Sequence, residues 1–217
     1  GFFDKLSSGF RSLLLIDIDI NKPSKFLYKH LNLAWIFGVI YFISGFFDGT
    51  SEYYRFEDNV LIFGKPAYII IKLVVLVSFV FFMRGFVMMG GLFKNYLLKI
   101  ITILIIGANV LLLGYDIISV FYESGERESV LIGAALSFGG MGIIFGVALT
   151  RLKKYLGAIA VWAGVFEIIA AAFFLTVLLS FIGFIVLIPA ELFEIILIFK
   201  AIHILKEKEK SEMEAIG

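Results

Sequence analysis

The sequence contains no cysteine, only two histidines and only three prolines among its 217 residues. Without cysteine the chain has no disulfide, no thiolate metal site and no cysteine nucleophile. The two histidines, His30 and His203, stand far apart, and the chain has neither an H-E-x-x-H motif nor a Glu-x-x-His pair. We therefore expect no zinc or di-iron site.

Catalytic and nucleotide-binding signatures are also missing. The chain has no G-x-S-x-G, no Walker loop and no dinucleotide fingerprint. The glycine-rich run "GGMGIIFG" at residues 139–146 lacks a preceding strand and lies inside an apolar segment, which excludes a phosphate-binding loop. We predict a protein that is not an enzyme, takes no cofactor and binds no nucleic acid.

Charge is scarce. Charged residues make up 17% of the chain and hydrophobic residues 61%, with a mean hydropathy of +1.01, whereas soluble domains have about 25% charged residues. The apolar residues form runs long enough to cross about 30 Å of hydrocarbon as helices. The sequence therefore predicts an all-α polytopic transmembrane bundle surrounded by lipid. The six expected spans are 31–47, 67–87, 96–121, 130–149, 156–179 and 184–205.

Lysine and arginine are unevenly divided between the two sides that these spans define. One side holds both termini and carries fifteen of them, while the other side carries only Arg55, Lys65 and Arg127. Short cytoplasmic loops are enriched in these residues, so both termini are predicted to be cytoplasmic. A prokaryotic cytoplasmic membrane is the expected location. The longest loop between spans, residues 48–66, is then predicted to face outward.

The residues before the first span have their own pattern. Apolar residues recur there at helical spacing, with polar residues on the opposite face. We predict an amphipathic helix in the membrane interface, serving either as a lipid anchor or as a docking surface for a partner. The apolar set is Phe3, Leu6, Phe10, Leu13 and Leu14.

The first span begins behind this long polar stretch, which shows no small-residue cleavage pattern, so we expect no removed secretory signal. The chain then divides into an interfacial segment at 1–30, a six-helix domain at 31–205 and a charged cytoplasmic tail at 206–217.

The junction between the last two spans has no charged residue. Ser180 and Gly183 are the expected turn formers there. Pro189 admits two placements: in the first turn of a span over about 189–207, where proline is tolerated, or as a kink inside a longer span. We favour the kink, because the other placement strands the apolar run "FIGFIVLI" as a loop.

The fourth span is rich in small residues, including Gly139 and the pair Gly142 and Gly146 four positions apart. Such residues let membrane helices approach closely. We expect this span at the centre of the bundle. The alternative is that its small face dimerises two copies of the chain.

Several polar residues fall inside the predicted spans, where ionisable groups are costly and suggest function. Glu191 and Glu194 are one turn apart on one helix face, and buried carboxyl groups that repel one another take up protons readily. The alternative is structural, with Lys72 paired to Asp116 or Glu191 to hold helices in register. The complete candidate cluster is Lys72, Asn109, Asp116, Glu167, Glu191 and Glu194.

Three segments of the sequence resemble segments of other membrane proteins: "MRGFVMMGGLFKNYLLKI", "ALTRLKKYLGAIAVWAGVFEII" and "LTVLLSFIGFIVLIPAELFEIILIFKA". Because of these segments, the region from about residue 84 to residue 206 resembles a broad group of small, uncharacterised polytopic membrane proteins of archaea and bacteria. The resemblance implies about six helices and brings no activity.

Two function classes follow. The first is a non-enzymatic accessory or scaffolding subunit, which would contact itself or another membrane protein through the fourth span or the N-terminal helix. The second is a small proton- or cation-coupled channel or transporter that uses the intramembrane carboxylates. The missing catalytic motifs and the small-residue span favour the first.

Overall fold

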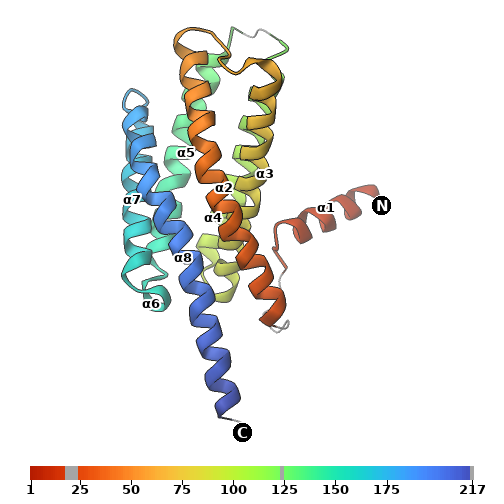
Figure 1. Ribbon diagram of the computed structural model, residues 1–217, viewed down its shortest axis with the longest axis vertical. Helices are drawn as coiled ribbons and strands as arrows, with labels where there is room; N and C mark the ends of the chain where they lie inside the picture. Colours follow the sequence, from red (N-terminus) through yellow and green to blue (C-terminus); the bar gives the residue numbers. More distant parts are fainter. Residues whose placement is uncertain (18–23, 123–124, 216–217) are drawn as a thin grey trace.

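The structure is a computed structural model that describes residues 1–17, 24–122 and 125–215, and within these ranges every regular element is a helix (Figure 1). Six of the helices are long and apolar enough to cross a membrane, so the predicted polytopic helical bundle is confirmed. The elements are α1 (Phe2–Leu13), α2 (Ser24–Glu57), α3 (Gly64–Leu92), α4 (Tyr96–Ile118), α5 (Arg127–Thr150), α6 (Lys153–Leu156), α7 (Ala158–Leu175) and α8 (Ser180–Glu214).

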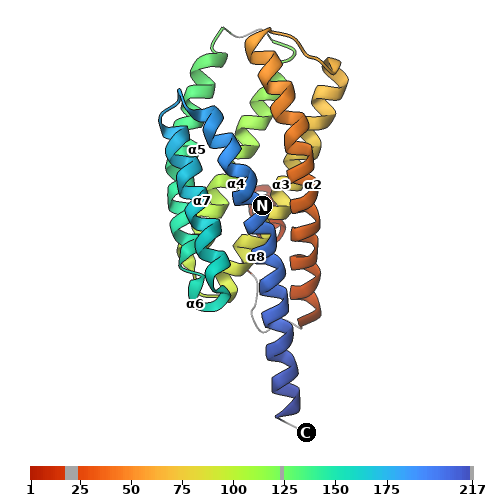
Figure 2. The same ribbon diagram turned by 60° about the vertical axis from the view of Figure 1, so that its left-hand side comes forward.

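The six long helices form a closed ring in chain order, because each packs on the next and α8 packs on α2 (Figures 1 and 2). Packing is extensive within α2–α3–α4 and within α5–α7–α8. It is less extensive at the two seams that join these halves, α2 with α8 and α4 with α5. The bundle is thus two three-helix halves in contact along two seams.

Aromatic side chains fill the interior of the ring. Phe82 packs edge-on against Phe86 with ring centroids 5.4 Å apart, and Phe86 meets Phe145 of α5 at 5.5 Å. Tyr41 of α2 stacks on Phe82 at 6.1 Å. The outer surface carries exposed leucine, isoleucine, valine and phenylalanine on all six long helices. A lipid environment explains this surface, since a bundle of this size in water would bury such side chains.

Two helices extend beyond their predicted ends. The prediction of a loop at 48–66 is wrong, because α2 continues to Glu57 and only the short connection 58–63 separates it from α3. The predicted tail is helical as far as Glu214. Ion pairs between residues four positions apart stabilise this polar helix, including Lys208 with Glu212 at 3.9 Å and Lys210 with Glu214 at 3.8 Å. Residues 18–23 and 216–217 of the predicted terminal segments lie outside the described residues.

The last junction also differs from the prediction. The turn lies at 176–179, where Val177 adopts a left-handed φ of 59° and the Thr176 hydroxyl accepts from the Leu179 N–H at 3.2 Å. Ser180 begins α8, and Gly183 lies inside it. Gly183 is needed for close packing rather than for a turn, since a Cβ there would lie 3.0 Å from the Ala170 carbonyl oxygen. Pro189 lies inside the longer last helix, as favoured.

The small residues of α5 face α7. A Cβ on Gly146 would lie 2.6 Å from the carbonyl oxygen of Gly164, and one on Gly142 would lie 2.9 Å from the Cβ of Ala171. Gly139 is equally close to Leu175. The small face of α5 is therefore used inside the chain, and α5 and α7 form the most intimate helix pair of the bundle.

Helix α1 projects sideways from the lower half of the bundle, across its long axis (Figure 1). The residues that follow it pack on the bundle: Leu14 and Leu15 are buried, and the Lys99 ammonium donates a hydrogen bond to the Ile16 carbonyl oxygen. The apolar face of α1 itself, with Phe3 and Phe10, remains exposed. The predicted amphipathic helix is thus present, and its position in the membrane interface stays a prediction.

Candidate functional site

The structure separates the predicted polar cluster into two groups. Lys72 and Asp116 belong to an ion-pair network near the end of the bundle where α2 meets α3, which we call the Lys72 network. Glu167, Glu191 and Glu194 lie together between α7 and α8, and we call them the glutamate cluster. Asn109 joins neither group, and its side chain forms no hydrogen bond with any described residue. The sequence indicated the depth of these residues but not which helices are neighbours.

The Lys72 network is centred on one buried ammonium group. The Lys72 side chain, 1% exposed, lies 2.8 Å from the Asp48 carboxylate, 3.1 Å from that of Glu52 and 3.0 Å from that of Asp116. These contacts join α2, α3 and α4. A lysine buried this deeply needs such partners, because an unpaired charge in an apolar interior costs several kcal/mol.

Further hydrogen bonds surround the carboxylates that contact Lys72. Arg127 of α5 pairs with Glu52, whose carboxylate also accepts a hydrogen bond from the Tyr68 hydroxyl. Arg55 donates to the Tyr68 hydroxyl at 2.6 Å and to the Ser119 hydroxyl at 2.8 Å. The network thus contains three basic groups and three carboxylates, although Arg55 contacts only hydroxyl and backbone oxygens. The formal charges balance and the contacts join four helices, so the Lys72 network holds these helices in register, while Oδ1 of Asp116 and Nε of Arg127 are buried without a hydrogen-bond partner.

Sequence reasoning missed the α2 members of this network because it assigned residues 48–66 to a loop. A signal was present: Asp48, Glu52 and Arg55 are spaced by four and three residues and so lie on one helix face. Arg127 was also assigned to a connection and not to the first turn of α5.

The glutamate cluster has no compensating charge. No lysine, arginine or histidine in the described part of the chain forms an ion pair with any of its three carboxyl groups. Glu194 is 4% exposed, and Glu167 and Glu191 are half-buried. The carboxyl groups of Glu167 and Glu194 lie side by side, close enough to share a proton. The second oxygen of Glu194, Oε1, is buried and has no hydrogen-bond partner.

Three helices besides α8 shape the surroundings of the glutamate cluster. On α5, Gly142 leaves room for Glu167, since a Cβ there would lie 3.3 Å from its Oε1. On α2, Tyr41 lies within electrostatic range of all three carboxyl groups and of Asp48 in the Lys72 network. The ring of Phe166 on α7 stacks on Phe193 of α8 at 5.5 Å, beside the cluster. The ring of Tyr41 itself packs on Phe79 and Phe82 of α3.

The geometry favours proton chemistry over metal binding. Two neighbouring carboxyl groups without a basic partner repel each other unless one of them carries a proton, because ionised carboxylates have no donor. No group of three or more histidine, cysteine, aspartate or glutamate side chains in the described ranges is arranged to hold a metal ion. The chemical capacity of the site is thus to hold a proton between Glu167 and Glu194 and to exchange it.

No family model, curated protein or solved structure matches this chain. The resemblance of residues 84–206 to small polytopic membrane proteins therefore stays a prediction. The function is inferred from the residues of the site itself.

Proposed function

We propose that this integral membrane protein is a small proton-coupled transporter in which Glu167 and Glu194 form the proton-binding pair. The observation that carries the proposal is the close approach of two carboxyl groups, Glu194 being buried, that have no basic partner among the described residues of a membrane-spanning bundle. Ionisable groups at such a position are costly, and proteins that move protons across membranes use them as relays.

The arrangement of the helices supports transport. The glutamate cluster lies between α7 and α8, inside one of the two three-helix halves, and α8 also forms the seam with α2. Many transporters bind their substrate between two halves that rock against each other. The aromatic core formed by Phe82, Phe86 and Phe145 closes the interior of the ring. A transporter that alternates between states agrees better with this closed interior than an open channel does.

Proton flux into proteoliposomes under an imposed pH gradient tests this function. We expect Glu194→Gln and Glu167→Gln each to reduce the flux by about 100-fold or more, the scale of losing a proton-transfer group. Glutamine keeps the shape and a hydrogen bond but cannot release a proton. Glu212→Gln, on the exposed end of α8, is the matched control and should leave the flux unchanged. Flux that survives both buried substitutions would contradict the proposal.

A second candidate is an accessory subunit that assembles with another membrane protein. The observation in its favour is the exposed apolar face of α1, where Phe2, Phe3 and Leu6 are at least 59% exposed. The small face of α5 no longer supports assembly, because α7 covers it. The same flux experiment separates the two candidates: a parent protein without flux, together with correctly folded variants, would leave the glutamates structural and favour the accessory role.

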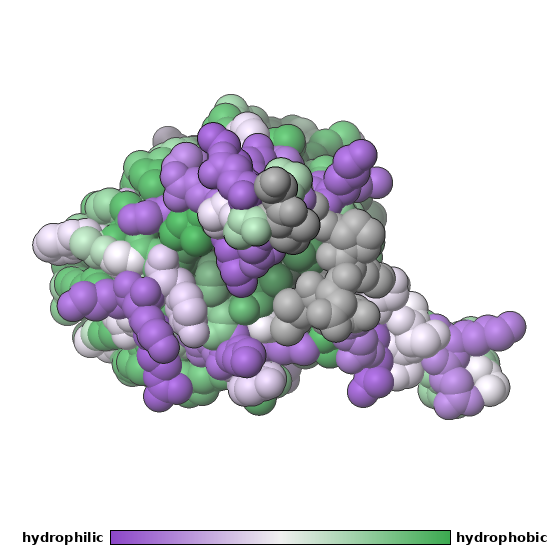
Figure 3. Space-filling view, turned by 90° about the horizontal axis from the view of Figure 1, so that it is seen from below, coloured by the Kyte–Doolittle hydropathy of each residue, from purple (hydrophilic) through white to green (hydrophobic). Residues whose placement is uncertain are grey.

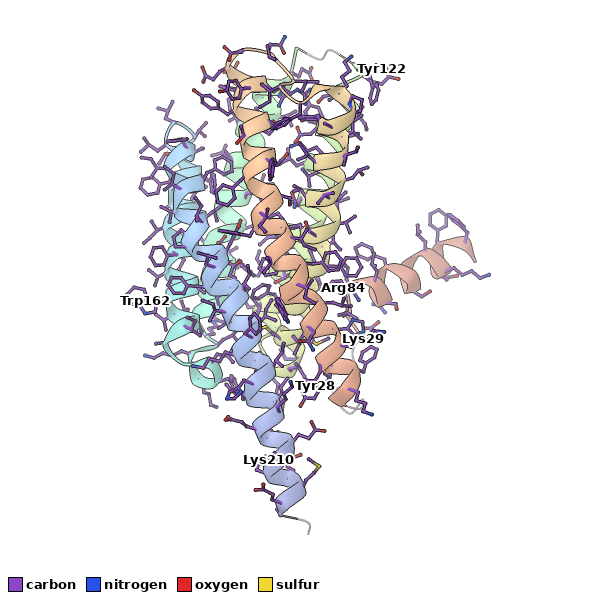
Figure 4. The ribbon with its side chains drawn as sticks, viewed as in Figure 1. Tyr28, Lys29, Arg84, Tyr122, Trp162 and Lys210 are labelled. Atoms are coloured by element: carbon purple, nitrogen blue, oxygen red, sulfur yellow. The ribbon has the colours of Figure 1, made fainter. Side chains whose placement is uncertain are left out.

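We further propose that the protein resides in a prokaryotic cytoplasmic membrane with both termini in the cytoplasm. The distribution of basic residues supports this orientation. Tyr28, Lys29 and Lys210 lie toward the lower end of the molecule, whereas Tyr122 lies at the opposite end (Figure 4). Tyr28 donates a hydrogen bond to Glu209 at 2.8 Å, so the start of α2 and the end of α8 are joined at this lower end.

A further inference from the structure

A groove opens at the lower end of the bundle, where the connection between α3 and α4 meets the connection between α5 and α6. Its volume is about 280 Å³, and its walls include Lys94 and Tyr96 from one connection and Arg151 and Tyr155 from the other. Hydrophilic side chains gather on this end of the molecule, while the sides are hydrophobic (Figure 3). The groove therefore lies at the boundary between the charged end and the apolar belt.

The basic residues of the groove have no acidic partner. Lys94 and Arg151 are exposed, and neither forms an ion pair with any residue that the structure describes. Lys153 and Lys154 of α6 follow directly and are also without an acidic partner. The groove thus combines two flexible basic side chains with an excess of positive charge nearby, which attracts an anion.

The groove is held in shape by contacts beneath it. The Asn95 side chain is buried, donates to the Ala148 carbonyl oxygen at 2.8 Å and accepts from the Leu98 N–H at 3.2 Å. Phe93 packs against Tyr155 with ring centroids 4.9 Å apart. These contacts connect the two walls, so the groove does not need to order itself on binding.

Apolar side chains lead from the groove into the belt. On α4, Ile100 and Leu104 follow Tyr96 at four-residue spacing, and all three are exposed. On α5, Val147 and Ile144 precede Arg151 by four and seven residues, and both are exposed. Residues spaced in this way share a helix face. Two apolar stripes therefore run from the basic groove, one along α4 and one along α5.

We propose that this groove binds an anionic phospholipid, with the headgroup phosphate held by Lys94 and Arg151 and the acyl chains lying along the two stripes. Arginine and lysine at the membrane surface bind phosphate through charge-assisted hydrogen bonds, and basic pockets between membrane helices accept acidic headgroups. The apolar stripes favour a lipid over a soluble phosphate, because only a lipid would bury them. The lipid bridges the α4–α5 seam and stabilises the contact between the two halves there.

Native mass spectrometry of the detergent-solubilised protein, titrated with phosphatidylglycerol or phosphatidylcholine, tests this site. We expect preferential retention of phosphatidylglycerol, and we expect the double variant Lys94→Asn with Arg151→Gln to weaken it by at least about tenfold, since each lost phosphate contact removes a charge-assisted bond. Asparagine suits position 94 because Lys94 has a left-handed φ of 51°, which asparagine adopts readily. The parent and the variant should unfold at the same temperature, because both side chains are exposed.

The control is Lys208→Gln with Lys210→Gln, which removes the same charge from the end of α8 and should leave binding unchanged. Equal weakening by both pairs would overturn the proposal, because net charge alone would then explain the binding. Displacement of phosphatidylglycerol by glycerol 3-phosphate at equal concentration would also overturn it, since the groove would then recognise a free phosphate and not a lipid.

Discussion

Replacing Lys72 by methionine is expected to lower the free energy of unfolding by about 3–5 kcal/mol, the cost of breaking a buried ion pair by removing one partner. Methionine has a similar length but no charge, so the carboxylates of Asp48, Glu52 and Asp116 would face one another without their common counterion. Net stabilities of proteins are only about 5–15 kcal/mol, so a loss of this size removes a large fraction. Thermal unfolding in detergent, followed by the fluorescence of Trp35 and Trp162, measures it.

Two comparisons make the Lys72 experiment specific. Lys65→Met removes an exposed lysine from the same end of α3 and should change stability by no more than about 0.5 kcal/mol. Adding Asp116→Asn to Lys72→Met should restore part of the loss, because it removes one of the repelling charges. If Lys72→Met unfolded at the same temperature as the parent protein, the proposed structural role of the Lys72 network would be wrong.

The substitution Gly146→Ala is expected to separate α5 from α7 and to destabilise the protein by about 1–3 kcal/mol or more, the range for overpacking. The added methyl group would lie 2.6 Å both from the carbonyl oxygen of Gly164 and from a side-chain carbon of Ile168. The backbone oxygen cannot move without its whole helix. Because Glu167 lies between these two residues on α7, proton flux should fall together with stability.

Gly140→Ala is the matched control on the same helix. A Cβ at Gly140 has nothing within 4 Å, so alanine should be tolerated and should stabilise the helix by up to about 1 kcal/mol through its higher propensity. The difference in unfolding temperature between the two variants is the measured quantity. Equal behaviour of Gly146→Ala and Gly140→Ala would contradict the close α5–α7 contact.

Much of the fold follows from composition and from the length of the apolar runs, because only helices that satisfy their own backbone hydrogen bonds cross a bilayer readily. The close-packed face of α5 followed from Gly142 and Gly146. Helix ends were harder to predict where polar residues continue a helix beyond the lipid, as they do from Asp48 to Glu57 and from Lys206 to Glu214.

The candidate site was only partly predictable, for a physical reason. A residue's position along a span gives its depth, but the partner of each side chain depends on helix order and rotation around the ring. Lys72 and Glu167 fall in different groups because α3 packs mainly on α2 and α4, while α7 packs mainly on α5 and α8. The pairing of Glu167 with Glu194 across α7 and α8 follows from their shared helix interface, which depth alone did not indicate.

The membrane-spanning arrangement with cytoplasmic termini is tested most directly by the reaction of single cysteines with a membrane-impermeant maleimide, since the parent chain has no cysteine. Tyr122→Cys should react in intact cells, Lys210→Cys should react only after the cells are opened, and Leu104→Cys, exposed to lipid on α4, should react in neither case (Figure 4). Reaction of Lys210→Cys in intact cells would contradict the orientation. Rapid reaction of Leu104→Cys would contradict the bilayer around the helices.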